Sequence, residues 1–222
     1  MKDFTIDPLG EKAIEISIPS WDLTRYLMLA KNLKAKKIIG ITEIVPYPRS
    51  LFIQYDPFLF SINKFENYLK GIEQELEKKH KEGKDVITLP VCYDREYALD
   101  AEELSQKLKV SFEKIIHIHQ ASEFRLEMYG FIPGFIYLYG LDKQIQLPRK
   151  LSPSVKIPEG SVAIANEYCG IYPADSPGGW HVIGKTPISL FDPGREPPFL
   201  FHVGQKIRFE AITLQEFLAW DK

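Results

Sequence analysis

The sequence predicts an α+β protein with two parts, a small α/β sandwich followed by a β-barrel or β-sandwich. Strand-like and helix-like periodicities alternate in the first half in the order β-α-β-β-α-β. In the second half, short β-rich runs are separated by glycine and proline turns. The chain has 222 residues, of which 45% are hydrophobic, so it can fold around a buried core.

The first half opens with a strand over residues 14–18, where isoleucines alternate with polar residues. Ser20 is placed to cap a helix over residues 23–33, whose apolar positions recur at helical spacing. Two strands are expected next, over residues 37–45 and 51–55, because two prolines separate these β-rich runs.

The clearest helix of the first half carries a single apolar stripe opposite a charged face. The stripe consists of Ile62, Phe65, Leu69, Ile72 and Leu76. A final strand over residues 86–91 would complete a ferredoxin-like βαββαβ domain. We place this domain at residues 1–93.

The second half is predicted to begin with two helices. Asp100 and Glu103 have the spacing of a capping box, which would open a short helix that ends at Leu108. Ser111 can cap a second helix that continues to Ala121.

The rest of the second half is rich in strands. Apolar residues alternate around residues 162–164 and 207–209, and many Gly/Pro turns separate such runs, as in a closed barrel or a sandwich. Thr213 and Glu216 can cap a last short helix. This domain is placed at residues 94–222.

Composition excludes several classes of function. Lys and Arg total 28 and Asp and Glu total 30, so there is no electrostatic reason to expect nucleic acid or an anionic membrane as a partner. Two cysteines and five scattered histidines offer no metal-ligand spacing, and no metal site is expected. The chain shows no signal-peptide pattern and no apolar run near ~18 residues, so a cytoplasmic protein without membrane spans is expected.

Several long blocks in the second half resemble one known family. They are GFIPGFIYLYGLD at 130–142, PRK at 148–150, PEGSVAIA at 158–165, GIYPADSPGGWHVIGKTP at 170–187 and LFDP at 190–193. The run from Glu43 to Asp56 also matches that family's pattern E-x-V-P-x-x-R-S-L-x-x-x-Y-D. The family contains the B-subunit of 5-oxoprolinase, the sporulation-kinase inhibitor KipI and the first subunit of allophanate hydrolase.

The resemblance implies a ferredoxin-like N-terminal domain and a cyclophilin-like β-barrel domain. It also implies partners, namely the C-subunit and the separate A-subunit of 5-oxoprolinase, which together with this chain would open 5-oxo-L-proline to L-glutamate with ATP hydrolysis. We expect ATP to be bound in the complex, and little or no activity from this chain alone. The sequence departs from the family at residues 166–169, at Ile136 and at Lys185, where the family usually has G-x-Q-T, proline and arginine.

The segment from Ser176 to Trp180 is the most suggestive candidate site. Pro177 and Gly178 suit a tight turn with a positive φ, and Gly179 would let a ligand approach the backbone. Successive N–H groups there could form a nest for an anion, and Trp180 could form a pocket wall. The structural alternative is a tight hairpin with a packed tryptophan.

Three arginines are candidates for binding a carboxylate or phosphate through the planar guanidinium. Arg149 follows a proline in a loop, Arg125 lies on a predicted strand, and Arg49 lies at a strand start. The alternative for each is a surface ion pair, which contributes little to stability.

His119, at the position of a histidine in the family, is a candidate acid, base or phosphate contact, although a lone helix histidine is more often structural. His117 would face another side of the same helix, so the two are a poor metal pair. Tyr172 could line the barrel mouth or simply fill it. For Cys169 we favour a small buried side chain over a nucleophile, because no group that would lower its pKa is evident.

Three functions remain open on the sequence alone. The first is an enzyme component that acts with the C- and A-subunits, and the second is a protein that binds and inhibits a sensor histidine kinase. The third is a relative of urea amidolyase that supplies the acceptor half of a biotin-dependent carboxyl transfer, because the chain lacks a biotin-attachment motif.

Overall fold

The computed structural model describes residues 4–19, 21, 23–79 and 86–220. The chain divides into two compact units, Met1–Gly83 and Lys84–Lys222. Each unit has its own buried apolar core. Within the described residues, no helix combines the length and the apolar character needed to cross a bilayer.

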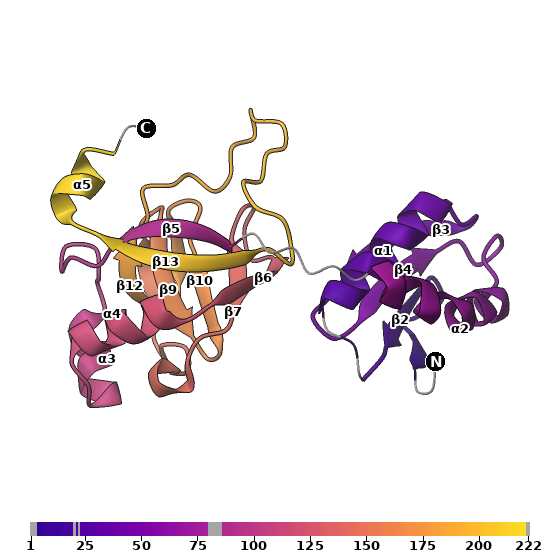
Figure 1. Ribbon diagram of the computed structural model, residues 1–222, viewed down its shortest axis with the longest axis horizontal. Helices are drawn as coiled ribbons and strands as arrows, with labels where there is room; N and C mark the ends of the chain where they lie inside the picture. Colours follow the sequence, from indigo (N-terminus) through magenta and orange to yellow (C-terminus); the bar gives the residue numbers. More distant parts are fainter. Residues whose placement is uncertain (1–3, 20, 22, 80–85, 221–222) are drawn as a thin grey trace. The chain divides into compact units, whose positions relative to one another are not determined.

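The first unit is a four-stranded antiparallel sheet with two helices (Figure 1). Its elements are β1 (Thr5–Pro8), β2 (Ala13–Ser17), α1 (Leu23–Lys36), β3 (Ile41–Pro46), β4 (Leu51–Tyr55) and α2 (Ile62–Lys79). The strand order is β1-β2-β4-β3. Leu29 and Leu33 of α1 and Leu69 of α2 pack with Ile53 of β4 in one core, as the apolar periodicity predicts.

The predicted ferredoxin-like order is not confirmed, because its last strand lies elsewhere. The strand over residues 86–91 exists as β5 (Val86–Cys92), but it pairs in parallel with β13 (Lys206–Ile212) in the second unit. Leu89 and Val91 are buried in the core of that unit. The edge of the first sheet beside β2 is instead occupied by β1, a short and largely exposed strand that ends at a proline and has no apolar alternation.

The second unit is a closed barrel with the strand order β10-β7-β6-β13-β5-β12-β9, which confirms the predicted barrel (Figure 1). Its other elements are α3 (Ala101–Leu108), α4 (Phe112–Ala121), β6 (Phe124–Tyr129), β7 (Ile136–Tyr139), η1 (Lys143–Ile145), β8 (Ser154–Ile157), β9 (Ser161–Ala165), β10 (Tyr168–Ile171), β11 (Ser176–Gly178), β12 (His181–Lys185) and α5 (Leu214–Leu218). β8 and β11 form a separate two-stranded ribbon.

One side of the barrel wall carries a second apolar cluster in addition to the barrel core. In β9, Val162 and Ile164 belong to the barrel core, whereas Ala163 and Ala165 belong to the second cluster. Successive side chains of a strand point to opposite faces, and each face of β9 packs on one of these two clusters. Every residue of β9 is therefore buried. The second cluster, here called the outer cluster, also contains Phe135, Ile157, Tyr172, Trp180 and Val182.

Of the three predicted helix caps that lie within the described residues, two are confirmed. The Ser111 hydroxyl accepts a hydrogen bond from the Lys114 N–H at 3.3 Å, and Thr213 with Glu216 forms a full capping box. Asp100 precedes α3 as predicted, but its side chain makes no capping hydrogen bond. Its carboxylate instead contacts residues that are distant in the sequence.

Two other expectations concern the first unit. The strand expected from Lys37 begins at Ile41, because Lys37 and Gly40 adopt φ values of 46° and 90° and turn the chain first. The predicted cap at Ser20 and the side chain of Leu76 lie outside the part of the chain that the structure describes.

Candidate functional site

A cleft of about 660 Å³ opens on the barrel unit. Glu159 and Gly160 contribute from the turn before β9, and Tyr172 and Pro173 from the end of β10. Residues 185–190, at the end of β12 and beyond it, form another side. These residues come from three of the sequence blocks described above, so stretches far apart in the chain meet at one cleft.

The remaining wall of the cleft is formed by Phe217, Leu218 and Trp220 at the C-terminal end of the described chain. The Phe217 ring packs on Tyr97, with 4.6 Å between ring centres. No residue of α5 is buried. This wall of the cleft is held by the Phe217–Tyr97 contact and by the capping box of Thr213 and Glu216.

Lys185 is the cation of the cleft. Its ammonium lies 5.5 Å from the centre of the Tyr97 ring, a cation–π geometry. Among the described residues no carboxylate forms an ion pair with Lys185, so its charge is available to an anionic ligand. The next residue, Thr186, donates its N–H to the Gly160 carbonyl at 2.9 Å. The two backbones are so close that a Cβ at Gly160 would lie 2.6 Å from the Thr186 carbonyl oxygen.

The predicted residues Arg149, Tyr172 and Trp180 meet at the outer cluster. Trp180 is 5% exposed and packs edge-on against Phe135 and Tyr137 at 5.5 and 5.6 Å between ring centres. The guanidinium of Arg149 lies 5.8 Å from the centre of the Trp180 ring. Arg149 is exposed and makes no hydrogen bond or ion pair with another described residue, so its donors can bind a carboxylate or phosphate.

Tyr172 lies between the cleft and the outer cluster. Its side chain is buried, and burial raises the pKa of the phenol to about 12, although the Trp180 N–H hydrogen-bonded to the hydroxyl acts in the opposite direction. The phenol is therefore neutral at neutral pH. It fills the cluster and fixes Trp180, and it does not act as a base.

The predicted turn in the SPGGW segment is wrong. Ser176–Gly178 forms the short strand β11, which pairs with β8, and neither Gly178 nor Gly179 has a positive φ. Gly178 is needed for a different reason, because a Cβ there would collide with the Tyr172 hydroxyl and would lie 2.8 Å from Ile157 Cδ1.

Arg125 and Arg49 do not join this arrangement. Arg125 lies on β6 opposite Tyr139 and Lys206, is half-buried, and has a contact of its own. Arg49 is exposed between β3 and β4 and belongs to the other compact unit. The Ser176 hydroxyl is buried and has no hydrogen-bond partner among the described residues.

His119 is better explained as a structural group than as a site acid or base. It is fully buried on α4, with Nδ1 2.8 Å from the Tyr93 hydroxyl and Nε2 3.3 Å from the Cys169 sulfur. Its ring stacks on Phe209 at 4.6 Å. Burial lowers the pKa of the imidazole from 6.5 to about 3, so the ring is neutral in the folded protein.

Cys169 is fully buried, as predicted, and burial raises the pKa of its thiol well above the usual range. Its neighbour across the core is the neutral His119, which supplies no positive charge to stabilise a thiolate. In the part of the chain that the structure describes, no three His, Cys, Asp or Glu side chains gather as metal ligands.

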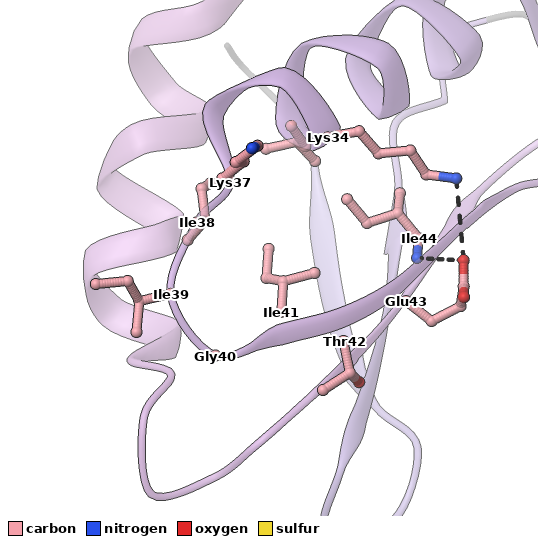
Figure 2. Close-up of a pocket in the computed structure, with 10 residues that line it drawn as sticks. Lys34, Lys37, Ile38, Ile39, Gly40, Ile41, Thr42, Glu43 and Ile44 are labelled. Atoms are coloured by element: carbon pink, nitrogen blue, oxygen red, sulfur yellow. Dashed lines mark hydrogen bonds and ion pairs between the residues drawn. The ribbon is translucent and has the colours of Figure 1, made fainter.

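A second cleft, of about 580 Å³, lies in the first unit between the end of α1 and β3 (Figure 2). Its Lys34 ammonium and Glu43 carboxylate are 3.9 Å apart, and Glu43 also accepts the Ile44 N–H at 3.1 Å. None of the predicted site residues lines this cleft, and its charges partly satisfy one another. The cleft in the barrel unit is therefore the stronger candidate.

Sequence reasoning missed the functional potential of three residues. Lys185 appeared only as a departure from the family's arginine, although a cation at that position was itself a signal. Phe217 and Trp220 belong to no motif, and only the capping box indicated their helix.

The family model of the carboxyltransferase domain, subdomain C and D, matches residues 4–201. Over 193 residues the chain is 36% identical to the 5-oxoprolinase B-subunit of Bacillus subtilis, covering 82% of this chain and 80% of that protein. It is 29% identical to the 5-oxoprolinase B-subunit of Haemophilus influenzae, covering 94% of this chain and 99% of the relative.

Two solved structures share the fold. TTHA0988 superposes with a TM-score of 0.78 at 33% identity, and the match covers 90% of this chain but only 40% of the length of TTHA0988. The urea amidolyase of K. lactis superposes with a TM-score of 0.72 over 97% of this chain and 15% of that chain, at 18% identity. The second similarity concerns the fold alone.

Proposed function

The chain belongs to the family of the carboxyltransferase domain, subdomain C and D, and on that basis we propose that it is the B-subunit of an ATP-dependent 5-oxoprolinase. In this proposal it acts with the C-subunit and the A-subunit of the enzyme. The complex opens 5-oxo-L-proline to L-glutamate with ATP hydrolysis, and this chain alone has little or no activity. Relatives named as the 5-oxoprolinase B-subunit support the assignment.

One structural observation carries the proposal, namely the convergence of three family blocks on the cleft that holds Lys185. The substrate has a carboxylate and a small ring that carries an amide. Lys185 would bind the carboxylate in a charge-assisted contact, and Leu190 and Phe217 would face the ring. The sides of the cleft are thus matched to the two ends of this substrate.

Opening the lactam needs activation, because an amide is a weak electrophile. ATP would transfer its γ-phosphoryl group to the carbonyl oxygen and leave as ADP. Water would then add to the carbonyl carbon, the ring C–N bond would break as the nitrogen takes up a proton, and inorganic phosphate would leave to give glutamate. The free guanidinium of Arg149 suits a phosphate oxygen or a carboxylate. The partner proteins of the complex would supply the remaining catalytic groups.

A component of a urea amidolyase-related enzyme is the second candidate. The fold similarity to urea amidolyase extends over nearly the whole chain, and the family is named for carboxyl transfer. Such a component would accept an amide such as a urea derivative at the same cleft. Substrate choice therefore separates it from the first candidate, while the architecture does not.

The test is to co-purify the chain with the C-subunit, add the A-subunit, and measure ATP hydrolysis with and without 5-oxoproline. We expect 5-oxoproline to stimulate ATP hydrolysis, and we expect this stimulation to disappear when the chain is omitted. Stimulation by urea derivatives alone would move the assignment to the second candidate. If no complex forms and the chain instead suppresses autophosphorylation of a sensor histidine kinase, the enzyme proposal is wrong.

The role of Lys185 is tested in the same assay. Lys185→Met should raise KM for 5-oxoproline about 10- to 100-fold, the range for loss of a hydrogen bond to a charged group. Lys185→Arg, which restores the cation usual in the family, should recover most of the affinity. Lys143→Met, at an exposed lysine on η1, is the matched control. An unchanged KM in Lys185→Met would remove Lys185 from the site without touching the assignment of the reaction.

A further inference from the structure

Asp100 and Lys150 form an ion pair that is almost buried, with side chains 12% and 10% exposed. The Lys150 ammonium lies 2.9 and 3.0 Å from the two carboxylate oxygens and donates to the Ser154 hydroxyl at 2.8 Å. One carboxylate oxygen of Asp100 also accepts the Val182 N–H at 2.6 Å. The carboxylate thus joins the start of α3, the strand β12 and the loop that follows η1.

Burying such a pair needs a reason beyond stability. Removing two charges from water costs nearly as much as their attraction returns, so a buried ion pair is weak evidence for stability, and we infer that this one fixes a geometry. Asp100 also leaves the N-terminus of α3 without a side-chain cap, although it stands at the capping position. The sequence therefore gives up a local capping contact in favour of the long-range one.

The geometry that the pair fixes is that of the loop bearing Arg149. The Lys150 N–H donates to the Gly179 carbonyl at 2.7 Å, and Nε2 of His181 lies 3.0 Å from the Pro148 carbonyl. Both neighbours of Arg149 are thus tied to the segment that carries Trp180. Arg149 itself is left exposed, with its guanidinium beside the Trp180 ring.

We propose that Asp100 and Lys150 are positioning residues that hold Arg149 as a preorganised binding group for a carboxylate or a phosphate. Lys150 is engaged by Asp100, so of the two adjacent cations only Arg149 can bind a ligand. A side chain already fixed before binding loses less conformational freedom on binding, which strengthens the contact. The identity of the anion, the carboxylate of 5-oxoproline or a phosphate of ATP, rests on the proposed function.

The decisive experiment is a double-mutant cycle in the assembled complex, using Asp100→Asn, Arg149→Ala and the double variant. Asp100→Asn is expected to raise KM about 10-fold with a smaller change in kcat, as for a lost binding contact. In the Arg149→Ala background the same change should add less than about twofold, because its effect passes through Arg149. A rise in KM for 5-oxoproline identifies the carboxylate, and a rise in KM for ATP identifies the phosphate.

Two milder variants keep the test valid if Asp100→Asn folds poorly. Ser154→Ala removes one contact of Lys150 and should raise KM about two- to threefold. Lys150→Arg keeps a cation for Asp100 but replaces the compact ammonium by a planar guanidinium, so it should raise KM by less than Asp100→Asn does. Glu103→Gln, which breaks the exposed Glu103–Lys107 pair on the same helix, is the matched control. Multiplicative effects of Asp100→Asn and Arg149→Ala would show a merely structural role and overturn the proposal.

A direct binding measurement separates this inference from the assignment of the reaction. Calorimetric titration of the full chain with pyrophosphate should show binding that weakens in Arg149→Ala and in Asp100→Asn without further loss in the double variant. If the titration gives this result but the complex does not turn over 5-oxoproline, the positioning role is retained and the assignment as a 5-oxoprolinase subunit is rejected. If the affinities for pyrophosphate and for 5-oxoproline are the same in Arg149→Ala and Asp100→Asn as in the wild type, the positioning role is rejected.

Discussion

Acidification should destabilise the barrel through His119. In the folded protein its pKa is about 3, against 6.5 for the free side chain, because the ring is fully buried. In the unfolded chain the ring therefore takes up a proton as the pH falls through about 6.5, while the folded protein stays neutral there. Between about pH 6.5 and about pH 3 the unfolded state binds more protons than the folded state. The stability contributed by the neutral ring is therefore fully present above about pH 6.5 and is lost progressively as the pH falls toward 3.

The size of the effect follows from the two pKa values. Lowering the pH from about 7.5 to about 5 leaves the folded ring neutral and protonates nearly all of the unfolded population. At about 1.4 kcal/mol per pKa unit, this favours unfolding by about 2 kcal/mol. The loss is large against the ~5–15 kcal/mol stability of a typical domain.

Urea denaturation followed by tryptophan fluorescence at several pH values measures this loss. His119→Gln, which cannot take up the proton, should show a free energy of unfolding that falls by about 2 kcal/mol less than that of the wild type across the same window. The difference between the two proteins cancels the contribution of every other titrating group. His117→Gln, at an exposed position of the same helix, is the control and should follow the wild type. Equal pH slopes in His119→Gln and the wild type would refute the neutral, buried state of His119.

Two further predictions concern packing and thiol reactivity. Gly178→Ala should lower the free energy of unfolding by about 1–3 kcal/mol, because a Cβ there would collide with the Tyr172 hydroxyl. Gly71→Ala is the control and should cause no such loss, because the space around Gly71 is open. Equal urea midpoints for the two variants would contradict this packing. Cys92 and Cys169 are both buried, and burial raises the pKa of each thiol. Neither cysteine should therefore react with a thiol reagent in the native protein, and both should react in urea. Rapid labelling of Cys169 in the native protein would contradict its burial.

The parts of the fold that the sequence predicts correctly are those encoded by local patterns. The apolar stripe of α2 and the serine before α4 depend on residues within a few positions of each other, and both helices are present. The short strands and Gly/Pro turns of the second half predicted a barrel or a sandwich, and only the family resemblance favoured the barrel. In contrast, the predicted place of β5 in the first domain is wrong, because its pairing partner β13 is remote in sequence and no local pattern indicates it.

The errors at the site have the same physical origin. The SPGG run has the composition of a turn, but pairing with β8 and the close approach of Tyr172 extend it into a strand. Asp100 has the local spacing of a cap, but Lys150 and Val182 compete for its carboxylate. Burial of His119 depends on Phe209 of β13 and Cys169 of β10, which lie far from α4 in the sequence, so no local pattern around the helix reveals it.

The parallel pairing of β5 with β13 also constrains how the protein is made. β5 leaves the ribosome long before β13, and its other barrel neighbour, β12, is aligned with it at a single residue pair, Lys185 with Cys92. Until residues 206–212 are synthesised, the nascent barrel therefore exposes an apolar strand with an open edge, the feature that chaperones bind and that leads to aggregation. The family match ends at residue 201, so the strand that closes the barrel lies beyond it. Expression boundaries drawn from the match alone would omit that strand and leave the nascent barrel permanently open.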